Sequence, residues 1–530
     1  ALRRTALSTI ITEVLDMGTA VLDRQGNISC SGAGIPAFVG VLDKALAAVL
    51  RKFPAASVAS GDVFVLNDPY EGGVTHLNDV VFCMPAFATG ELCAWACAIA
   101  HISDVGGRTA GSMATDAEEV FEEGLRIPPV KIVSQGECVQ GILDILHLNS
   151  RTPEYLDGDL WACIAAVRVG VCRLEELATK YGLRTCHEAM LQGLDLGEAE
   201  TLAALQTLPQ GTFKLCVPRE DGPGSFRTNI TISDTELCID LRDNDDQEKS
   251  PFNISRDAAV VAAQMLLKGV TGGSRLSNAG TFRPLRVLTR KGSIFEPHAP
   301  AAQSFYYETM ITLVDVLWRT LAQAMPDRLP AGHFASICGT IVFGQHPDSN
   351  SQYVIIEPEL GGWGASARGD GNSCVYSSMH GCTYNCPAEV AETRNGLLVD
   401  QVALNPESGG HGKFRGGKGV TIDYVVRADA RLTFSYSHAK QLPWPLAEGM
   451  PGTANYIQVW RSNGGWSERL SSATGLELAA GDRFRVVTGC GAGWGDPKDR
   501  DANAVKDDVR KGYISLEDAQ DIYGYEAFLA

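Results

Sequence analysis

The sequence of 530 residues contains no hydrophobic run of the roughly 18 residues that would suggest a membrane-spanning helix. It also has no excess of basic charge, since 45 Lys and Arg stand against 63 Asp and Glu, for a net charge of −18. Nucleic acids and anionic membranes attract basic surfaces, so the composition argues against either as a partner. No signal-peptide core with a cleavage site follows the first residues, and we expect a cytoplasmic protein.

Cysteine is present, but its arrangement lacks the usual signature of a zinc site. The two closest pairs are C-x3-C, at Cys93/Cys97 and Cys382/Cys386. Short-turn zinc sites instead use C-x2-C with a second matching pair. Many of the fifteen cysteines lie in apolar stretches, as Cys163 does. We therefore expect reduced, buried thiols rather than metal ligands or disulfides.

Two signatures of familiar enzyme classes are also missing. The chain has no G-x-S-x-G motif, which most serine hydrolases of the α/β type carry. Gly412-x4-Gly417-Lys418 resembles a phosphate-binding loop, but Gly419 stands where a Ser or Thr must bind magnesium. We expect these glycines to form tight turns between strands, and we expect no nucleotide site at this segment.

What the sequence does contain is typical of a large globular protein, with 45% apolar and 20% charged residues and 56 glycines. Strand patterns alternate with helix patterns, such as an amphipathic helix over 156–181, and no linker or repeat marks a boundary. We expect an α+β fold, a large composite with mixed sheets. The expected parts are an N-terminal metal-binding region (1–205), a mixed α/β middle region (206–334), and a β-rich region with glycine loops and a C-terminal helix (335–530).

The strongest local signal is a pair of H-x2-D motifs, His76-x2-Asp79 and His101-x2-Asp104, whose histidines lie 25 residues apart. Two imidazoles with one or two carboxylates suit Mn, Fe or Zn, whereas Ca and Mg prefer shells made only of oxygen. Such an ion can activate water or polarise a carbonyl group. The alternative is that these polar side chains only hold the ends of loops by hydrogen bonds.

A hairpin explains how the two motifs meet. If the strands 80–87 and 92–100 pair around a turn at Thr89-Gly90, the numbers of cross-strand partners sum to about 179. His101 then lies beside Asn78 and Asp79, with the first histidine one diagonal step away. A shift of one residue would move the side chains to the opposite face.

Motifs along nearly the whole chain resemble those of the hydantoinase B/oxoprolinase family. They are long enough to be specific, and they occur in the family's order. They are Asn67-Asp68-Pro69-Tyr70, Thr75-His76-Leu77-x-Asp79-Val80, Ala100-His101-x-x-Asp104-Val105-Gly106-Gly107, Gly361-Gly362-Trp363-Gly364, Asn385-x-Pro387-x-Glu389, Ser408-Gly409-Gly410-x-Gly412-x-Phe414-Arg415-Gly416-Gly417 and Gly491-x-Gly493-x-Gly495-Asp496-Pro497.

The resemblance implies a hetero-oligomer with a division of labour. The family includes B subunits of ATP-dependent hydantoinases, oxoprolinases and lactamases, and similar subunits of acetone and acetophenone carboxylases. A hydantoinase A-like partner subunit, related to kinases, would bind ATP with Mg and phosphorylate the small-molecule substrate. The B subunit would then process the activated intermediate at a divalent transition metal (Mn, Zn or Fe).

The family's metal ligands fall on His76, Asp79 and His101, with a further carboxylate on Asp16, where the surrounding residues depart from the family's pattern. Other departures concern the substrate more than the metal. The second imidazole that often follows the later histidine is absent, and Cys386 replaces a customary threonine.

Two enzymatic functions follow from the resemblance. The first is an ATP-dependent cyclic amide hydrolase acting on hydantoin, 5-oxoproline or a lactam, in which Asp104 or Asp79 helps water attack the ring carbon as a base. The alternative is a subunit of an ATP-dependent ketone carboxylase, whose B-type subunits are often longer. A scaffold that only docks the kinase-like partner, and a metal hydrolase that needs no ATP, are the remaining hypotheses.

Overall fold

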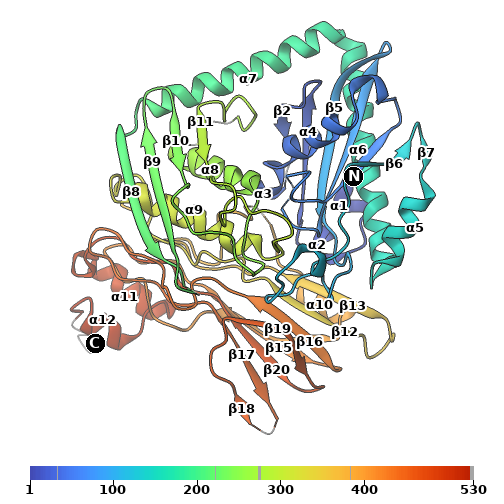
Figure 1. Cartoon of the computed structure of the whole chain (residues 1–530). Helices are drawn as coiled ribbons and strands as arrows, with labels where there is room; N and C mark the ends of the chain where they lie inside the picture. Colours follow the sequence, from blue (N-terminus) through green and yellow to red (C-terminus); the bar gives the residue numbers. More distant parts are fainter. Residues whose placement is uncertain are drawn as a thin grey trace.

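The computed structural model describes residues 1–530 except Ala33, Val74, Asp221, 273–275, Cys382, Asn463 and 526–530. One member of the Cys382/Cys386 pair therefore lies outside the described residues. The expected α+β fold with mixed sheets is confirmed. The N-terminal and middle sheets stand on either side in Figure 1, and the C-terminal β region lies below both.

The N-terminal part is built on a seven-stranded antiparallel sheet in the order β2-β1-β5-β4-β3-β6-β7. Nearly every residue of its central strands β4 and β5 is buried, because helices α4 and α6 both pack on them. This explains the long apolar runs in these strands. The strands are β1 (Met17–Asp23), β2 (Ile28–Ser31), β3 (Val63–Leu66), β4 (Asp79–Ala88), β5 (Glu91–His101), β6 (Val130–Ser134) and β7 (Glu137–Cys138).

Helices of very different length surround this sheet. The expected amphipathic helix is α6, and α7 continues from it along the top of the molecule toward the middle sheet (Figure 1). The helices are α1 (Leu2–Thr5), α2 (Thr9–Thr12), α3 (Pro36–Val39), α4 (Leu42–Lys52), α5 (Gln140–Leu148), α6 (Pro153–Tyr181) and α7 (Leu183–Leu205), with 3-10 turns η1 (Ala55–Ser57) and η2 (Val120–Glu122).

The middle part is a four-stranded sheet in the order β11-β10-β9-β8, with α9 packed on β8 and β9 and α8 packed on α9. Only β10 and β11 pair in parallel, because helix α8 lies between them in the chain. The elements are β8 (Gly211–Pro218), β9 (Ser225–Ile232), β10 (Leu237–Asp240), α8 (Arg256–Val270), β11 (Leu285–Leu288) and α9 (Tyr306–Ala322).

The C-terminal part holds two antiparallel sheets, in the orders β13-β12-β16-β19 and β14-β15-β20-β17-β18. The chain ends in short helices, as expected. The elements are β12 (Thr340–Gln345), β13 (Gln352–Glu357), α10 (Ala388–Arg394), β14 (Leu397–Leu404), β15 (Val420–Val426), β16 (Ala430–Ser435), β17 (Tyr456–Arg461), β18 (Gly465–Trp466), β19 (Ser472–Leu478), β20 (Arg483–Val487), η3 (Pro497–Asp499), α11 (Ala502–Lys511) and α12 (Leu516–Asp521).

The glycine loops of the C-terminal part meet one another directly. A Cβ atom on Gly362 would lie 2.1 Å from the carbonyl oxygen of Gly417 and 2.4 Å from the nitrogen of Gly491. Only glycine allows three backbones to approach so closely. Lys418, which follows this contact, is buried and donates a hydrogen bond to the carbonyl oxygen of Glu407. These glycines therefore serve backbone packing.

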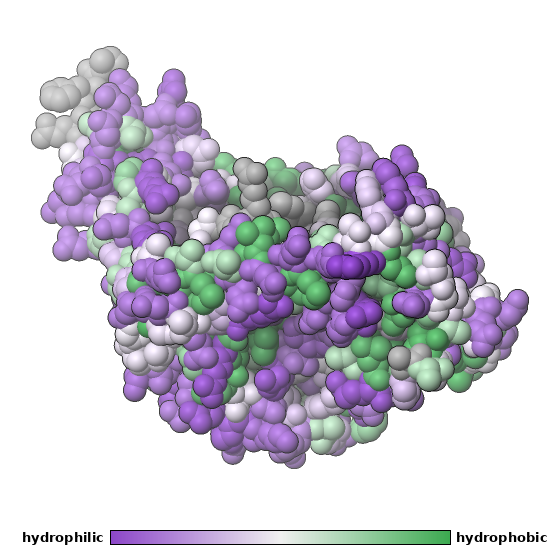
Figure 2. Space-filling model, turned by 90° about the horizontal axis from the view of Figure 1, so that it is seen from above, coloured by the Kyte–Doolittle hydropathy of each residue, from purple (hydrophilic) through white to green (hydrophobic). Residues whose placement is uncertain are grey.

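One hydrophobic core runs through the N-terminal and middle parts, and a second fills the C-terminal β region. None of the helices described in the structure is long and apolar enough to cross a membrane. Seen from above, most of the surface is hydrophilic and the hydrophobic side chains form scattered patches (Figure 2). The boundaries at 205/206 and 334/335 stay predictions.

Candidate metal centre

The hairpin of β4 and β5 brings the two histidine motifs together. Asp79 pairs directly with His101 in the sheet. Along most of the hairpin the two residue numbers of each cross-strand pair sum to 180. The sum is 179 next to the turn, where a bulge lies between Ala86 and Phe87. The bulge inserts one residue and so decides which residue stands opposite His101.

Three potential ligand atoms converge at the open end of this hairpin. His76 Nε2 lies 3.2 Å from Asp79 Oδ1 and 3.3 Å from His101 Nδ1, and the latter lies 3.3 Å from Asp79 Oδ1. All three side chains are buried, with at most 3% of each residue exposed. They are the one group of three or more potential ligands found among the described residues. We call them the histidine–aspartate cluster.

Asp16 lies at the edge of the cluster. Its Oδ2 is 3.8 Å from His101 Nδ1, and its carbonyl oxygen accepts a hydrogen bond from the backbone N–H of His101. It directly precedes β1 and follows Leu15, whose φ of 66° is in the left-handed region that side chains other than glycine rarely adopt. This turn places Asp16 next to the cluster, and its role as a ligand stays a prediction.

Neighbouring polar groups fix the orientation of the cluster. The hydroxyl groups of Thr75 and Tyr306 donate hydrogen bonds to Asp79 Oδ2, which leaves Oδ1 facing the two imidazoles. Nδ1 of His76 lies 2.9 Å from the carbonyl oxygen of Ser304, so it carries the proton and Nε2 presents its lone pair. Glu123 holds this carbonyl in place, because its Oε1 accepts hydrogen bonds from the N–H groups of residues 303 and 304.

Burial and mutual charge set the protonation of the cluster. Burial alone would raise the pKa of Asp79, but the neighbouring imidazoles His76 and His101 hold it well below its ordinary value. Burial raises the pKa of Asp16 well above its usual range, and the charge of Asp79 adds to the effect. The pKa of His76 is raised despite its burial, by Asp79, while burial lowers the pKa of His101.

The residues fit a transition-metal ion. Two ligands of a tetrahedral ion bound at about 2.0–2.1 Å lie about 3.3 Å apart, close to the separations within the cluster. Oδ1 of Asp79 and Oδ1 of Asp16 are buried and accept no hydrogen bond from any described residue. The hydrogen bond from His76 to a carbonyl group is the support that metal-binding histidines commonly have. Two imidazoles and two carboxylates are a donor set for Mn, Fe or Zn.

A small apolar cavity adjoins the cluster. Its volume is about 50 Å³, and its walls come from all three parts of the chain, including Phe38, Tyr307 and Ile341. His380 also lines it, with 7% of the residue exposed and a buried Nδ1 that has no hydrogen-bond partner among the described residues. Burial lowers the pKa of His380 to about 3. In the sequence His380 stands apart from other candidate ligands, which is more typical of a structural histidine than of a ligand.

The structure does not bring Asp104 into the cluster. Its carboxylate is fully buried and accepts hydrogen bonds from the N–H groups of Gly106, Gly111 and Arg151 and from the guanidinium group of Arg151, each at 3.0–3.1 Å. These bonds hold the loop that follows β5 and leads to Met113 in the cavity wall. A carboxylate with four such donors stabilises the folded loop. To act as the expected base, Asp104 would have to lose some of these hydrogen bonds.

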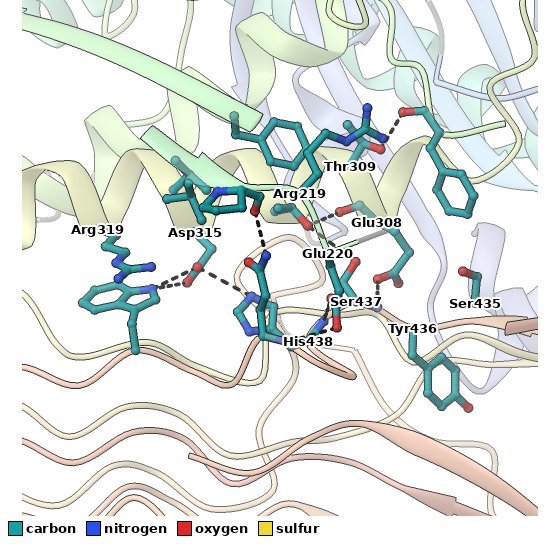
Figure 3. A pocket seen from close by; sticks show the side chains of 18 of the residues that line it. Arg219, Glu220, Glu308, Thr309, Asp315, Arg319, Ser435, Tyr436, Ser437 and His438 are labelled. Atoms are coloured by element: carbon teal, nitrogen blue, oxygen red, sulfur yellow. Dashed lines mark hydrogen bonds and ion pairs between the residues drawn. The ribbon is translucent and has the colours of Figure 1, made fainter. Parts of the chain in front are cut away.

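A second cavity, of about 270 Å³, lies on another side of α9 (Figure 3). Glu308 and Asp315 project into it from the helix. Asp315 accepts hydrogen bonds from the indole of Trp444 and lies 3.6 Å from the imidazole of His438. Glu308 accepts hydrogen bonds from the backbone N–H groups of residues 337 and 437 and from a serine hydroxyl. It thereby joins α9 to two C-terminal loops.

Glu308 makes folding stability depend on pH. Burial raises its pKa to about 7, from an ordinary 4.5. The folded state therefore binds a proton at Glu308 more tightly than the unfolded state does. The contribution of this proton to the free energy of unfolding is fully present below pH 4.5 and is lost as pH rises through 7. We expect Glu308→Gln to flatten the stability–pH profile in this window by up to about 1.4 kcal/mol per pH unit. Denaturant titrations from pH 4.5 to 8, with the exposed Glu176→Gln as control, measure this; parallel profiles of wild type and Glu308→Gln would contradict it.

Comparison with known proteins places the chain in a family. The model of the hydantoinase B/oxoprolinase family matches residues 1–497. An uncharacterized protein of Methanocaldococcus jannaschii is 31% identical over 98% of this chain and 91% of its own length. The caprolactamase subunit beta of Pseudomonas jessenii is 29% identical over 99% of this chain and 92% of its own length.

Two further matches agree. The crystal structure of the ATP-dependent caprolactamase from Pseudomonas jessenii superposes with a TM-score of 0.92 at 27% identity, covering 99% of this chain and 92% of that one. The acetophenone carboxylase delta subunit of Aromatoleum aromaticum is 25% identical over 88% of this chain and 75% of its own length. The chain belongs to the hydantoinase B/oxoprolinase family.

Proposed function

We propose that this chain is the metal-binding B subunit of an ATP-dependent cyclic amide hydrolase. Its partner would be a kinase-like A subunit that binds ATP and phosphorylates a hydantoin, 5-oxoproline or lactam ring. The observation that carries the proposal is the buried histidine–aspartate cluster beside a small, mostly apolar cavity, in a chain of this family. The nearly full mutual coverage with the caprolactamase subunit supports the same function.

The chemistry requires two waters and one ATP. Transfer of the phosphoryl group to the amide oxygen gives an O-phosphorylated imidate and ADP. Water adds to its carbon and gives up a proton. The ring carbon–nitrogen bond must then break, with a proton going to nitrogen, because loss of phosphate at this point would only restore the amide. A second water hydrolyses the remaining acyl phosphate to a carboxylate and phosphate.

The chain's residues have distinct tasks in this proposal. His76, Asp79 and His101, with Asp16, would hold the metal ion, which when bound supplies a Lewis acid for an oxygen of the substrate and favours deprotonation of water. Asp79 stays the candidate base of the two carboxylates predicted from the sequence. We assign Asp104 to holding the loop, because its hydrogen bonds are all made within the fold.

A ketone carboxylase subunit is the alternative. It would use the same cluster and the same kind of partner, but the partner would make an enol phosphate and carboxy phosphate. The enolate, freed when water takes up the phosphoryl group as phosphate, would then attack the carbon dioxide released from carboxy phosphate. The match to the acetophenone carboxylase subunit keeps this alternative open. The match spans 75% of the length of that relative but 92% of the length of the caprolactamase subunit. This difference favours the cyclic amide hydrolase over the carboxylase.

The test is an assay of the chain purified with its ATP-binding partner. We expect ε-caprolactam or 5-oxoproline to be opened to an amino acid, or hydantoin to an N-carbamoyl amino acid, with release of ADP and phosphate, and only when ATP and both subunits are present. Product from the isolated chain without ATP would establish the ATP-independent hydrolase instead. Consumption of bicarbonate with acetone or acetophenone, and no ring opening, would establish the carboxylase.

A further inference from the structure

Two buried glutamates lie close together near the metal centre. Glu357 ends β13 and Glu359 follows two residues later, and at most 4% of each residue is exposed. The Nδ2 atom of Asn385 lies 3.0 Å from Oε1 of Glu357 and 2.8 Å from Oε2 of Glu359, so one amide donates to both carboxyl groups. The backbone N–H of Cys386 also donates to Glu357. We call Glu357 and Glu359 the glutamate pair.

No positive charge balances this pair. Among the described residues, no Lys, Arg or His forms an ion pair with either carboxyl group, and the titratable groups around the pair are themselves acids. They are the thiols of Cys338 and Cys386 and the phenols of Tyr376, Tyr424 and Tyr436. Burial raises the pKa of Glu357 to about 8, and burial and the charge of Glu357 together raise the pKa of Glu359. Two carboxyl groups in one buried site resist ionising together, so the pair keeps at least one proton at neutral pH.

Asn385 connects the glutamate pair to the metal centre. Its Oδ1 atom accepts a hydrogen bond of 2.9 Å from the hydroxyl group of Tyr376. Tyr376 begins the segment 376–380, which ends in a turn. Met379 and His380 of this turn line the cavity beside the histidine–aspartate cluster. A displacement of Asn385 would therefore release a segment that forms part of the wall at the metal centre.

We propose that Glu357 and Glu359 share one proton and, through Asn385, hold the segment 376–380 in place against the metal centre. They are positioning residues whose effect is lost at alkaline pH. Loss of the shared proton leaves two buried like charges beside one amide, and one carboxylate must then move toward water. The proposal rests on the proposed function only in taking the histidine–aspartate cluster as the reaction centre.

The direction of the pH dependence follows from the raised pKa values. The folded, closed arrangement binds the proton more tightly than free glutamate does. Its contribution to holding the segment is fully present below the ordinary pKa of 4.5 and is lost as pH rises through about 8. Near neutral pH the segment is therefore held, and it becomes released on the alkaline side.

Amide hydrogen exchange in the complex purified with its partner measures this segment without an assay of activity. The readout is the N–H of His380, which donates to the carbonyl oxygen of Ser377. After correction for the intrinsic exchange rate, we expect its protection in wild type to fall about 10-fold from pH 7 to pH 9, because each pH unit above the pKa changes the equilibrium by that factor. The double variant Glu357→Gln/Glu359→Gln cannot ionise and should keep its protection at pH 9.

Two further variants separate the pair from general effects of burial. Glu308→Gln also replaces a buried glutamate of raised pKa, and as the matched control it should respond to pH as wild type does. Tyr376→Phe removes the hydroxyl group that donates to Asn385 and leaves both carboxyl groups in place. We expect its protection at pH 7 to be about 2–10-fold below that of wild type, which corresponds to one hydrogen bond.

Activity provides a second readout. The fall of kcat/KM on the alkaline side should shift to higher pH in the double variant, with metal content unchanged. Equal protection of His380 in wild type at pH 7 and pH 9, or the same loss in the double variant, would overturn the proposal. If the segment responds as expected but no cyclic amide is opened, the positioning role stands and the proposed function fails.

Discussion

Replacing Asp79 by Asn is expected to lower metal affinity by at least about 100-fold and activity to below about 1% of wild type. Changes to groups that merely support a ligand already cost about 10–100-fold, and Asp79 is proposed to be a ligand itself. Its Oδ1 faces both imidazoles at 3.2–3.3 Å, and Asn offers a neutral, weaker donor in the same shape. Metal analysis of the purified complex after dialysis, and titration with Mn, Zn and Fe salts, measure the effect.

A control variant distinguishes loss of a ligand from general damage. His411 is buried and contacts the hydroxyl group of Tyr523 in the C-terminal part, so His411→Ala removes a buried imidazole that does not belong to the cluster. We expect that variant to keep its metal, and His76→Ala to lose it as Asp79→Asn does. If both cluster variants retained one ion per chain with unchanged affinity, the cluster would be only a hydrogen-bonded loop end. The function as a scaffold for the partner would then be favoured over the metal-dependent hydrolase.

The local part of this site could be predicted from the sequence. A hairpin with a tight turn fixes its register from the turn outward, and the predicted sum of about 179 holds for the pairs next to Thr89 and Gly90. The bulge between Ala86 and Phe87 could not be predicted, because both residues fit a regular strand. It moves the sum to 180 and places Asp79, rather than Asn78, opposite His101.

The distant part of the site could not be predicted. Ser304, Tyr306 and His380 reach the cluster only because the middle and C-terminal parts pack over the open end of the hairpin. Their spacing in the sequence carries no period that points to one site. Glu308 could line a site by its residue type, but no spacing in the sequence assigns it to one, and it faces the second cavity.

Tertiary contacts also prevent one helix that the local sequence pattern predicts. The sequence of residues 117–124 taken alone predicts a helix, but the structure has only the 3-10 turn η2 (Val120–Glu122). The backbone N–H of Val120 donates to the carbonyl oxygen of Pro300, and Gly124 has a φ of 141°. This tertiary hydrogen bond and the two prolines at 128 and 129 favour an extended chain over a longer helix.

Replacing Asp104 by Ala is expected to lower the free energy of unfolding by about 3 kcal/mol, the lower end of the range for breaking a buried ion pair. Asp104 is fully buried, while the side chain of its partner Arg151 is 31% exposed and can be partly hydrated. The variant leaves the N–H groups of Gly106 and Gly111 without their acceptor. Denaturant unfolding of Asp104→Ala, Arg151→Ala and the double variant measures the coupling, and the double variant should lose less than the sum of the single ones.

The same variants decide whether Asp104 acts in catalysis. A general base contributes about 10²–10⁴-fold to the rate, so its loss would reduce kcat by that factor even where the protein is fully folded. If Asp104 only holds the loop, then Asp104→Asn, assayed well below its unfolding transition, should keep kcat within about 10-fold of wild type. Any remaining loss should then be matched by Arg151→Ala, because both variants release the same loop and the cavity wall at Met113. A large loss of kcat in Asp104→Asn, with Arg151→Ala near wild type, would instead make Asp104 the base.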